Sequence, residues 1–280
     1  MSHSPSIGLL LTRHPSDRLS SIMPEVARLL AGRGAVVEHM YLDEVVTALS
    51  DLDPRHDLYV LKSGSDSALS LAGALHEAGA AILNPYPVAA ASRDKILLTS
   101  VLRKAGIPIP DSFVAGSLQG LEPLLVDGPL VVKPYRGSQG RGVRVVREIM
   151  DLAAFVDGPG PFFAQRYHQP IGRDRKLYRI GSRVYGVKRV WPVQSYEDKL
   201  GEPFKVPNEL HEIVLRAGDA LGIELYGLDV VETEEGPIVV DFSSFPGFKG
   251  VPEAASALAE LIWAGAQRAR EGVALERVAG

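Results

Sequence analysis

The sequence contains no cysteine, and this absence removes several kinds of chemistry at once. A chain without thiols has no disulfide bonds, no thiolate metal ligands and no cysteine nucleophile. No apolar run approaches the length of a membrane span. The opening residues, Met-Ser-His-Ser-Pro-Ser, lack the basic start and the apolar stretch of a signal peptide. We therefore expect a cytoplasmic protein with no membrane partner.

An excess of positive charge is also missing. The formal net charge is −4, from 30 Lys and Arg residues against 34 Asp and Glu residues. No strongly basic face is implied, so nucleic acid is not an expected partner. The chain has 280 residues, of which 46% are hydrophobic and 23% charged. This composition is typical of a soluble globular protein, and the length allows two or three lobes.

Glycine, in contrast, is concentrated in one informative stretch, residues 130–146 (LVVKPYRGSQGRGVRVV). A β-type run ends in Lys133, a glycine-rich loop follows, and a second β-type run comes next, which predicts a strand–loop–strand hairpin. Such a loop lets backbone N–H groups approach an anion, and Lys133 would add an ammonium beside it. A glycine-rich hairpin with a strand lysine is one way to cover the phosphates of ATP. The loop residues that this hypothesis involves are Gly137, Ser138, Gln139, Gly140 and Gly142.

Three other interpretations of this stretch compete with a phosphate-binding loop. A dinucleotide fingerprint requires G-x-G-x-x-G at the opening of a helix, whereas the order here is G-x-x-G-x-G and a strand-like run follows. A Walker A loop requires a final Gly-Lys-Ser/Thr, which the chain lacks. The third interpretation is a surface hairpin without a ligand, and the loop alone leaves it open.

Upstream of this hairpin, the pattern predicts a small parallel α/β domain. Apolar runs near residues 7–11, 35–42, 58–61 and 81–83 alternate with amphipathic stretches at 20–30 and 66–79. No glycine fingerprint follows the first run, so we expect no nucleotide there. The Asn-Pro-Tyr-Pro sequence at 84–87 marks a boundary. Lys95 then falls in a predicted helix at 92–104 and, taken alone, is an ordinary solvated lysine.

Cations and carboxylates gather on predicted strands in the second half. A hairpin over 176–189 turns at Gly181-Ser182, and strand alternation places Lys188 and Arg189 on opposite faces. Several cations on one sheet, Lys176 included, indicate either a bound anion or a solvated face. Asp229 and Asp241 lie on two predicted antiparallel strands and form a candidate Mg²⁺ site, since this ion prefers oxygen ligands. Helices are predicted at 148–156, 208–221 and 253–269.

Taken together, these motifs over residues 85–268 resemble the ATP-grasp superfamily. The resemblance implies that the lysine of Arg93-Asp94-Lys95 and Lys133 contact ATP phosphates beneath the glycine loop. It also implies a hinge around the adenine, two metal-binding strands, and cations that act on the γ-phosphate or an anionic acceptor. The residues implied are Gln165, Arg166, Tyr167 and His168 for the hinge, Lys188 as a further nucleotide contact, Asp229, Asp241 and Ser243 for metal, and Arg189 and Lys176 for catalysis.

Two branches of the superfamily compete for this chain. The glycine loop is similar to the bacterial glutamate-ligase branch, which modifies ribosomal protein, although the Asn…Arg-Gly-Gly stretch of that branch is missing. Lys188-Arg189 and the segment 245–253 resemble inositol trisphosphate kinases, but their substrate-contacting histidine is absent from the loop. Ser243 stands where both branches have a metal-binding asparagine, so an ATP-binding protein with little turnover is a third hypothesis.

The sequence therefore predicts an α/β (α+β) protein with the ATP-grasp fold and a Rossmann-like parallel N-terminal domain. We expect that domain over residues 1–86 and the ATP-grasp domain over 87–280, with lobes at 87–161 and 162–272. The predicted function is a carboxylate–amine ligase that uses ATP and Mg²⁺, with Mn²⁺ as an alternative metal. Its substrate is expected to be an anionic small molecule or peptide, and homo-oligomerisation is left open.

Overall fold

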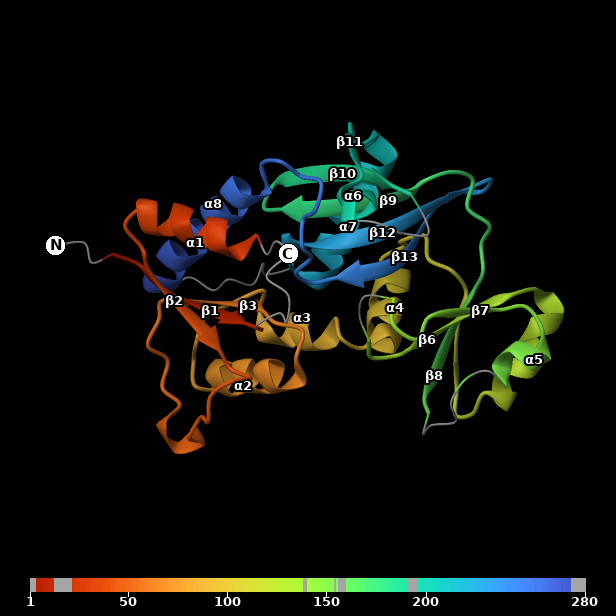
Figure 1. The fold of residues 1–280 in the computed structure, drawn as a ribbon, viewed down its shortest axis with the longest axis horizontal. Helices are drawn as coiled ribbons and strands as arrows, with labels where there is room; N and C mark the ends of the chain where they lie inside the picture. The colour runs from red at the N-terminus through yellow and green to blue at the C-terminus, as the bar shows by residue number, and fades with distance from the viewer. Residues whose placement is uncertain are drawn as a thin grey trace.

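The computed structural model describes residues 4–12, 22–137, 140–153, 155, 160–190 and 196–272, with only the backbone of residues 196 and 199. Three β-sheets organise this part of the chain, and we call them the N-terminal, small and central sheets. Figure 1 shows the N-terminal sheet at one end of the molecule, the small sheet at the other, and the central sheet between them. No helix of the described residues is long and apolar enough to cross a membrane.

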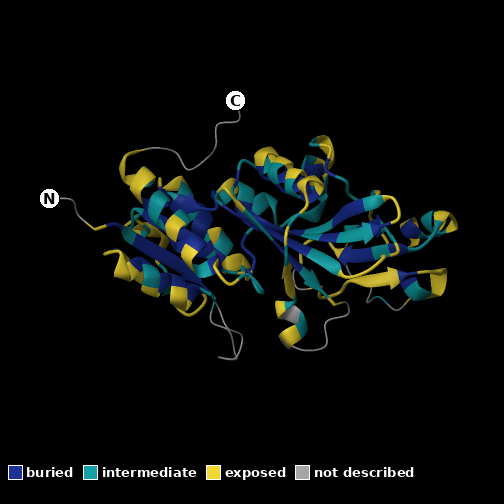
Figure 2. Ribbon diagram, turned by 90° about the horizontal axis from the view of Figure 1, so that it is seen from above, coloured by how far each residue is buried: buried dark blue, intermediate teal, exposed yellow. Residues whose placement is uncertain are grey.

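The N-terminal sheet is entirely parallel, as the alternating pattern predicts. It contains β1 (Ser6–Leu11), β2 (Val36–Tyr41), β3 (Leu58–Lys62) and β4 (Ile82–Leu83) in the order β2-β1-β3-β4. Apolar side chains on one face pack against α1 (Met23–Gly32) and α8 (Ala254–Arg270). The other face packs against α2 (Asp66–Glu77) and α3 (Tyr86–Ala91). β1, β3 and β4 are largely buried between these helices, whereas the edge strand β2 is exposed or half-buried. Figure 2 shows exposed residues on the outer surfaces of the helices.

The small sheet carries the glycine-rich hairpin. It contains β5 (Ser112–Ala115), β6 (Leu130–Pro134), β7 (Arg144–Val146) and β8 (Phe162–Arg166), all antiparallel, in the order β5-β8-β6-β7. β6 pairs with β7, so the predicted strand–loop–strand hairpin is confirmed. The helix α4 (Lys95–Lys104) precedes the sheet, and the 3-10 segment η2 (Gln119–Asp127) joins β5 to β6.

The predicted helix at 148–156 is shorter than expected. The helix α5 covers only Ile149–Leu152, and Glu148 is its N-cap residue. The Asp151 carboxylate accepts hydrogen bonds from the backbone N–H groups of Arg147 and Glu148, at 2.7 and 3.1 Å. This contact fixes the start of the helix one residue later than predicted. Beyond the end of the helix, residues 154 and 156–159 lie outside the described part of the chain.

The central sheet is antiparallel and contains β9 (Asp174–Ile180), β10 (Arg183–Arg189), β11 (Glu202–Phe204), β12 (Leu225–Thr233) and β13 (Gly236–Ser243). Its order is β11-β10-β9-β12-β13, so β13 is an edge strand. One face packs against α7 (Asn208–Leu221) through a large apolar cluster. The predicted hairpin of β9 and β10 and the predicted helix at 208–221 are confirmed. The smaller elements are η1 (Leu49–Asp51) and α6 (Tyr196–Leu200).

Gly218 marks the closest packing of α7, and it gives a test of this fold. A Cβ atom at this position would come within 2.7 Å of the Ile223 carbonyl oxygen and 2.8 Å of the Tyr226 hydroxyl. We expect Gly218→Ala to lower the free energy of unfolding in urea by ~1–3 kcal/mol, the usual range for overpacking. Gly32→Ala is the control, because a Cβ there meets nothing within 4 Å. Equal effects of both substitutions would contradict this packing.

Candidate functional site

The register of the central sheet places the predicted carboxylates and cations on one face. Asp229 of β12 lies opposite Asp241 of β13 on one side and opposite Lys176 of β9 on the other. Residues directly opposite in antiparallel strands share a face, so these three side chains project together. Ser243 follows Asp241 by two residues and therefore lies on the same face. We call this surface the site face.

Lys95 reaches the site face from the first turn of α4. The Asp94 carboxylate caps this helix by accepting from the N–H groups of Ile96 and Leu97, at 2.9 and 3.1 Å. The Lys95 ammonium donates to the Gly137 carbonyl at 2.8 Å and lies 4.0 Å from the nearer Asp241 carboxylate oxygen. Lys95 therefore connects the start of the glycine-rich loop to the edge of the central sheet.

Lys133 approaches the same edge from the small sheet. It shares a face with Gln165 and Phe163 of β8, and its ammonium donates to the Gln165 side-chain oxygen at 2.6 Å. The same ammonium donates to the Val240 carbonyl of β13 at 2.8 Å. Burial lowers the pKa of Lys133, while the nearby Asp241 carboxylate opposes that shift. The side chain thus joins two sheets at the point where predicted phosphate and metal ligands meet.

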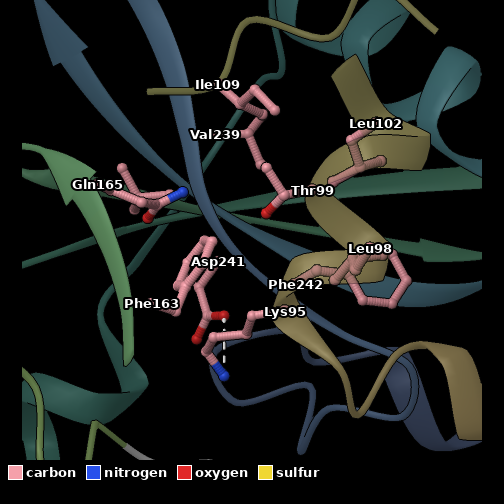
Figure 3. A pocket seen from close by; sticks show the side chains of 11 residues that line it. Lys95, Leu98, Thr99, Leu102, Ile109, Phe163, Gln165, Val239, Asp241 and Phe242 are labelled. Carbon is pink, nitrogen blue, oxygen red and sulfur yellow. Dashed lines mark ion pairs between the residues drawn. The ribbon is translucent and has the colours of Figure 1, made fainter. Parts of the chain in front are cut away.

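A mainly apolar pocket lies beside these charges. Figure 3 shows side chains of α4, β8 and β13 converging on it, with Lys95 and Asp241 facing each other at one end. Thr99 and Gln165 add polar groups to a lining that is otherwise dominated by aliphatic and aromatic side chains. The lining consists of Lys95, Leu98, Thr99, Leu102, Ile109, Phe163, Gln165, Val239, Val240, Asp241 and Phe242. An apolar pocket with a few convergent polar groups is the usual form of a small-molecule site.

The two aspartates fit a Mg²⁺ ion that also binds substrate phosphates. The Asp229 and Asp241 side chains are 38% and 39% exposed, so an ion can reach both. Asp229 pairs with the Lys176 ammonium at 2.6 Å, and an ion would share this carboxylate. Among the described residues, no group of three His, Cys, Asp or Glu side chains could hold a metal alone. One or two carboxylates plus phosphates is the common arrangement for Mg²⁺.

Arg189 and two residues that the sequence argument missed complete the site face. Arg189 lies opposite Asp174 across β9 and β10, and its guanidinium donates to the Tyr178 hydroxyl at 2.6 Å. The Arg189 Nε–H is buried and finds no hydrogen-bond partner among the described residues. Burial raises the pKa of Asp174, and the Asp229 charge adds to this shift. The alternation of Asp174, Lys176 and Tyr178 along β9 was the signal that could have found both residues.

The four predicted hinge residues do not all lie at the pocket. Gln165 lines the pocket, but the Arg166 guanidinium donates to the carbonyls of Leu124 and Gly128, at 3.0 and 2.6 Å. Tyr167 lies beneath the guanidinium of Arg147, with 5.3 Å from that group to the ring centroid. His168 is half-buried. Of these four side chains, only that of Gln165 lines the pocket that Figure 3 shows.

The structure also places Lys188 and part of the glycine loop. Lys188 lies on the face opposite Arg189, as strand alternation predicts, with its ammonium 5.5 Å from the centroid of the Phe204 ring. Gly140 and Gly142 have positive φ angles of 70° and 72°. A Cβ at Gly142 would also come within 2.9 Å of Pro134. Ser138 and Gln139 lie outside the described residues.

Comparison with known proteins identifies a family and a shared fold. Residues 92–262 match the model of the RimK-like ATP-grasp domain. The chain is 31% identical over 214 residues to the glutamate–LysW ligase ArgX of Sulfolobus acidocaldarius, covering 70% of this chain and 76% of that protein. It is 29% identical over 186 residues to a probable alpha-L-glutamate ligase of Trichodesmium erythraeum, covering 61% of this chain. The match spans only 62% of the length of the Trichodesmium protein.

A solved structure supports the same assignment of fold. The crystal structure of a RimK domain ATP-grasp protein from Sphaerobacter thermophilus superposes with a TM-score of 0.73 at 19% identity. The alignment covers 94% of this chain and 99% of that one. The predicted ATP-grasp fold is therefore confirmed. These proteins do not support the predicted similarity to inositol trisphosphate kinases.

The contact between Lys133 and Gln165 gives a test of the site geometry. Gln165→Leu leaves the buried ammonium with the Val240 carbonyl as its one acceptor among the described residues, so we expect a loss of ~1–3 kcal/mol in unfolding free energy. Lys133→Met removes the charge that needs that acceptor. The double variant should therefore lose less than the sum of the two single losses. Strict additivity in urea denaturation would show that the two side chains do not interact.

Proposed function

The chain belongs to the RimK-like ATP-grasp family, and we propose that it is an ATP-dependent ligase that joins a carboxylate to an amine through an acyl phosphate. The observation that carries this proposal is the convergence of Lys95, Lys133, Asp229 and Asp241 beside one apolar pocket. These elements suit a nucleotide whose base enters the pocket while its phosphates meet the cations.

The roles of the individual residues follow from their charge and place. Lys95 and Lys133 would neutralise phosphate oxygens, and the loop that contains Gly137, Gly140 and Gly142 would cover them. Asp229 and Asp241 would hold magnesium, or manganese in its place, with Ser243 as a further oxygen nearby, and the ion would supply positive charge beside the phosphates. The fit rests on two accessible carboxylates on one face.

Arg189 and Lys176 belong to the reacting end of the site in this proposal. The Arg189 guanidinium would stabilise negative charge on the γ-phosphoryl group or on an anionic acceptor. Lys176 holds the Asp229 carboxylate and adds positive charge where negative charge would develop. Both residues thus position charge, and no covalent role is needed.

The reaction has two balanced steps. An oxygen of the acceptor carboxylate bonds to the γ-phosphorus, the bond from that phosphorus to the bridging oxygen of ADP breaks, and ADP leaves. The amine nitrogen then bonds to the acyl carbon, inorganic phosphate leaves, and the amine loses a proton to solvent. Water must be kept from the acyl phosphate, and a closed glycine loop is the candidate barrier.

The names of both relatives include glutamate, so glutamate is the first substrate to test. The protein would be incubated with Mg-ATP and a panel of amino acids, acidic peptides and inositol phosphates, and ADP, phosphate and product mass would be measured together. We expect ADP, free phosphate and an amide product. A stable phosphorylated product without free phosphate would show a kinase instead. ATP binding without any product from the panel would favour a binding protein.

Asp229→Asn tests the proposed metal role. We expect the Mg²⁺ concentration for half-maximal turnover to rise by ~10–100-fold or more. Loss of a residue that only supports a metal ligand already lowers metal affinity by ~10–100-fold. Asp111→Asn is the matched control, since Asp111 is an exposed aspartate paired only with Arg103 in the described residues. A fully active Asp229→Asn protein with an unchanged Mg²⁺ requirement would remove Asp229 from the metal site.

A further inference from the structure

The N-terminal sheet has a topological switch point between β1 and β3. These strands are neighbours, but the chain leaves β1 toward β2 and leaves β3 toward β4, on opposite sides of the pair. In open α/β sheets, ligands bind outside the carboxyl ends of the strands at such a point. Here those ends are Thr12, directly after β1, and Lys62 with Ser63, at the end of β3.

Hydroxyl groups are concentrated at this switch point. The Thr12 hydroxyl is hydrogen-bonded to that of Ser63, which lies 3.2 Å from the Ser65 hydroxyl. Ser65 is the N-cap of α2 and accepts from the Ala68 N–H at 3.1 Å. Thr12, Ser63 and Ser65 are half-buried, and Gly64 is exposed. With Lys62 and Arg93, we call these residues the switch-point cluster.

Lys62 brings a charge that the cluster does not neutralise. Its ammonium donates to the Phe245 carbonyl at 2.6 Å and lies 5.0 Å from the Phe245 ring centroid. No carboxylate pairs with it among the described residues. Burial lowers the pKa of Lys62 to about 8. A cation with a carbonyl partner alone is costly to desolvate, whereas an anion beside it would offset that cost.

Arg93 connects the cluster to the proposed reaction site. Its guanidinium donates to the carbonyls of Gly64 and Ser63, at 2.8 and 2.9 Å. In the sequence, Arg93 precedes Lys95 by two residues. Phe245, which Lys62 contacts, lies two residues after Ser243 on the other side. The segments that lead into α4 and out of β13 therefore contact the cluster.

Two acids lie at the outer rim of the cluster. Asp66, almost fully exposed, is 3.7 Å from the Arg93 guanidinium. Asp43 accepts a hydrogen bond from Ser67, and the Ser67, Ser65 and Thr12 hydroxyls hold the pKa of Asp43 below its usual range. Neither acid pairs with Lys62. Both acids are exposed to solvent, and Lys62 is the cation of the cluster that they leave without a carboxylate.

We infer that the switch-point cluster binds a carboxylate of the ligase substrate other than the one that reacts. This inference rests on the proposed function, since it assigns a second anchoring point to a substrate of that reaction. Lys62 would pair with one carboxylate oxygen, and the Ser63 hydroxyl can donate to the other. The phosphates have separate cations in Lys95 and Lys133. The cluster therefore selects an amino acid or a peptide end that carries a spare carboxylate.

Protection of Lys62 from acetylation tests this binding directly. The full chain, loaded with Mg²⁺ and a non-hydrolysable ATP analogue, would be treated briefly with acetic anhydride and analysed by peptide mass spectrometry. L-glutamate or glutarate should slow modification of Lys62 several-fold, and the neutral glutaramide should not. Exposed Lys104 is the internal control and should react equally in all samples. Equal labelling of Lys62 with glutarate and glutaramide would overturn the inference.

Substitution separates charge from a merely structural contact. Lys62→Gln keeps an N–H donor for the Phe245 carbonyl but removes the charge, and Lys104→Met is the matched control. For the carboxylate substrate found in the panel, we expect Lys62→Gln to raise KM about tenfold or more, with the KM for ATP unchanged. Unchanged KM values, or equal losses for both substrates, would assign Lys62 to structure alone.

The two experiments also separate this inference from the proposed function. Protection of Lys62 by carboxylates without any amide product would support the cluster and contradict the ligase. Amide formation with unprotected Lys62 and an unchanged KM in Lys62→Gln would support the ligase and contradict the cluster.

Discussion

A single buried ammonium holds the candidate site together. Lys133 begins on the small sheet, yet one of its hydrogen bonds ends on the edge strand of the central sheet. A buried cation must keep every acceptor it has, because losing one leaves a desolvated charge. The positions of β8 and β13, and hence of the pocket between them, are therefore coupled to one side chain. That coupling explains why a residue suited to phosphate binding is also a structural tie.

Strand and turn patterns were the most dependable signals in the sequence. Turn residues between β-type runs predicted the hairpin of β6 and β7 and the two antiparallel strands that carry Asp229 and Asp241. Alternation predicted the separation of Lys188 from Arg189, because a period of two fixes the face of every residue. It could not reveal that the Arg166 side chain is occupied by the carbonyls of η2 and Gly128. That contact depends on how two distant segments pack, which no local pattern encodes.

The same limit applies to the N-terminal sheet. Its parallel pattern was predictable, but no local pattern indicates that α8, which lies far from them in sequence, packs against α1 and β3. The segment between β13 and α8 contains Phe245, whose carbonyl accepts a hydrogen bond from Lys62. The sheet without a nucleotide fingerprint thus borders the reaction site through its strand ends. The strand order of this sheet, and not a sequence motif, is what indicates a ligand site at its edge.

The balance of charge connects these features. The site face and its surroundings hold the cations Lys95, Lys133, Lys176 and Arg189 against the carboxylates Asp174, Asp229 and Asp241. A metal ion would add positive charge to this set, and a triphosphate would more than offset it. Lys62 lies beyond that set and has no carboxylate partner among the described residues, whereas Arg93 is 3.7 Å from Asp66. An anion beside Lys62 would offset the cost of burying this charge, and this electrostatic effect links the switch-point cluster to the proposed substrate.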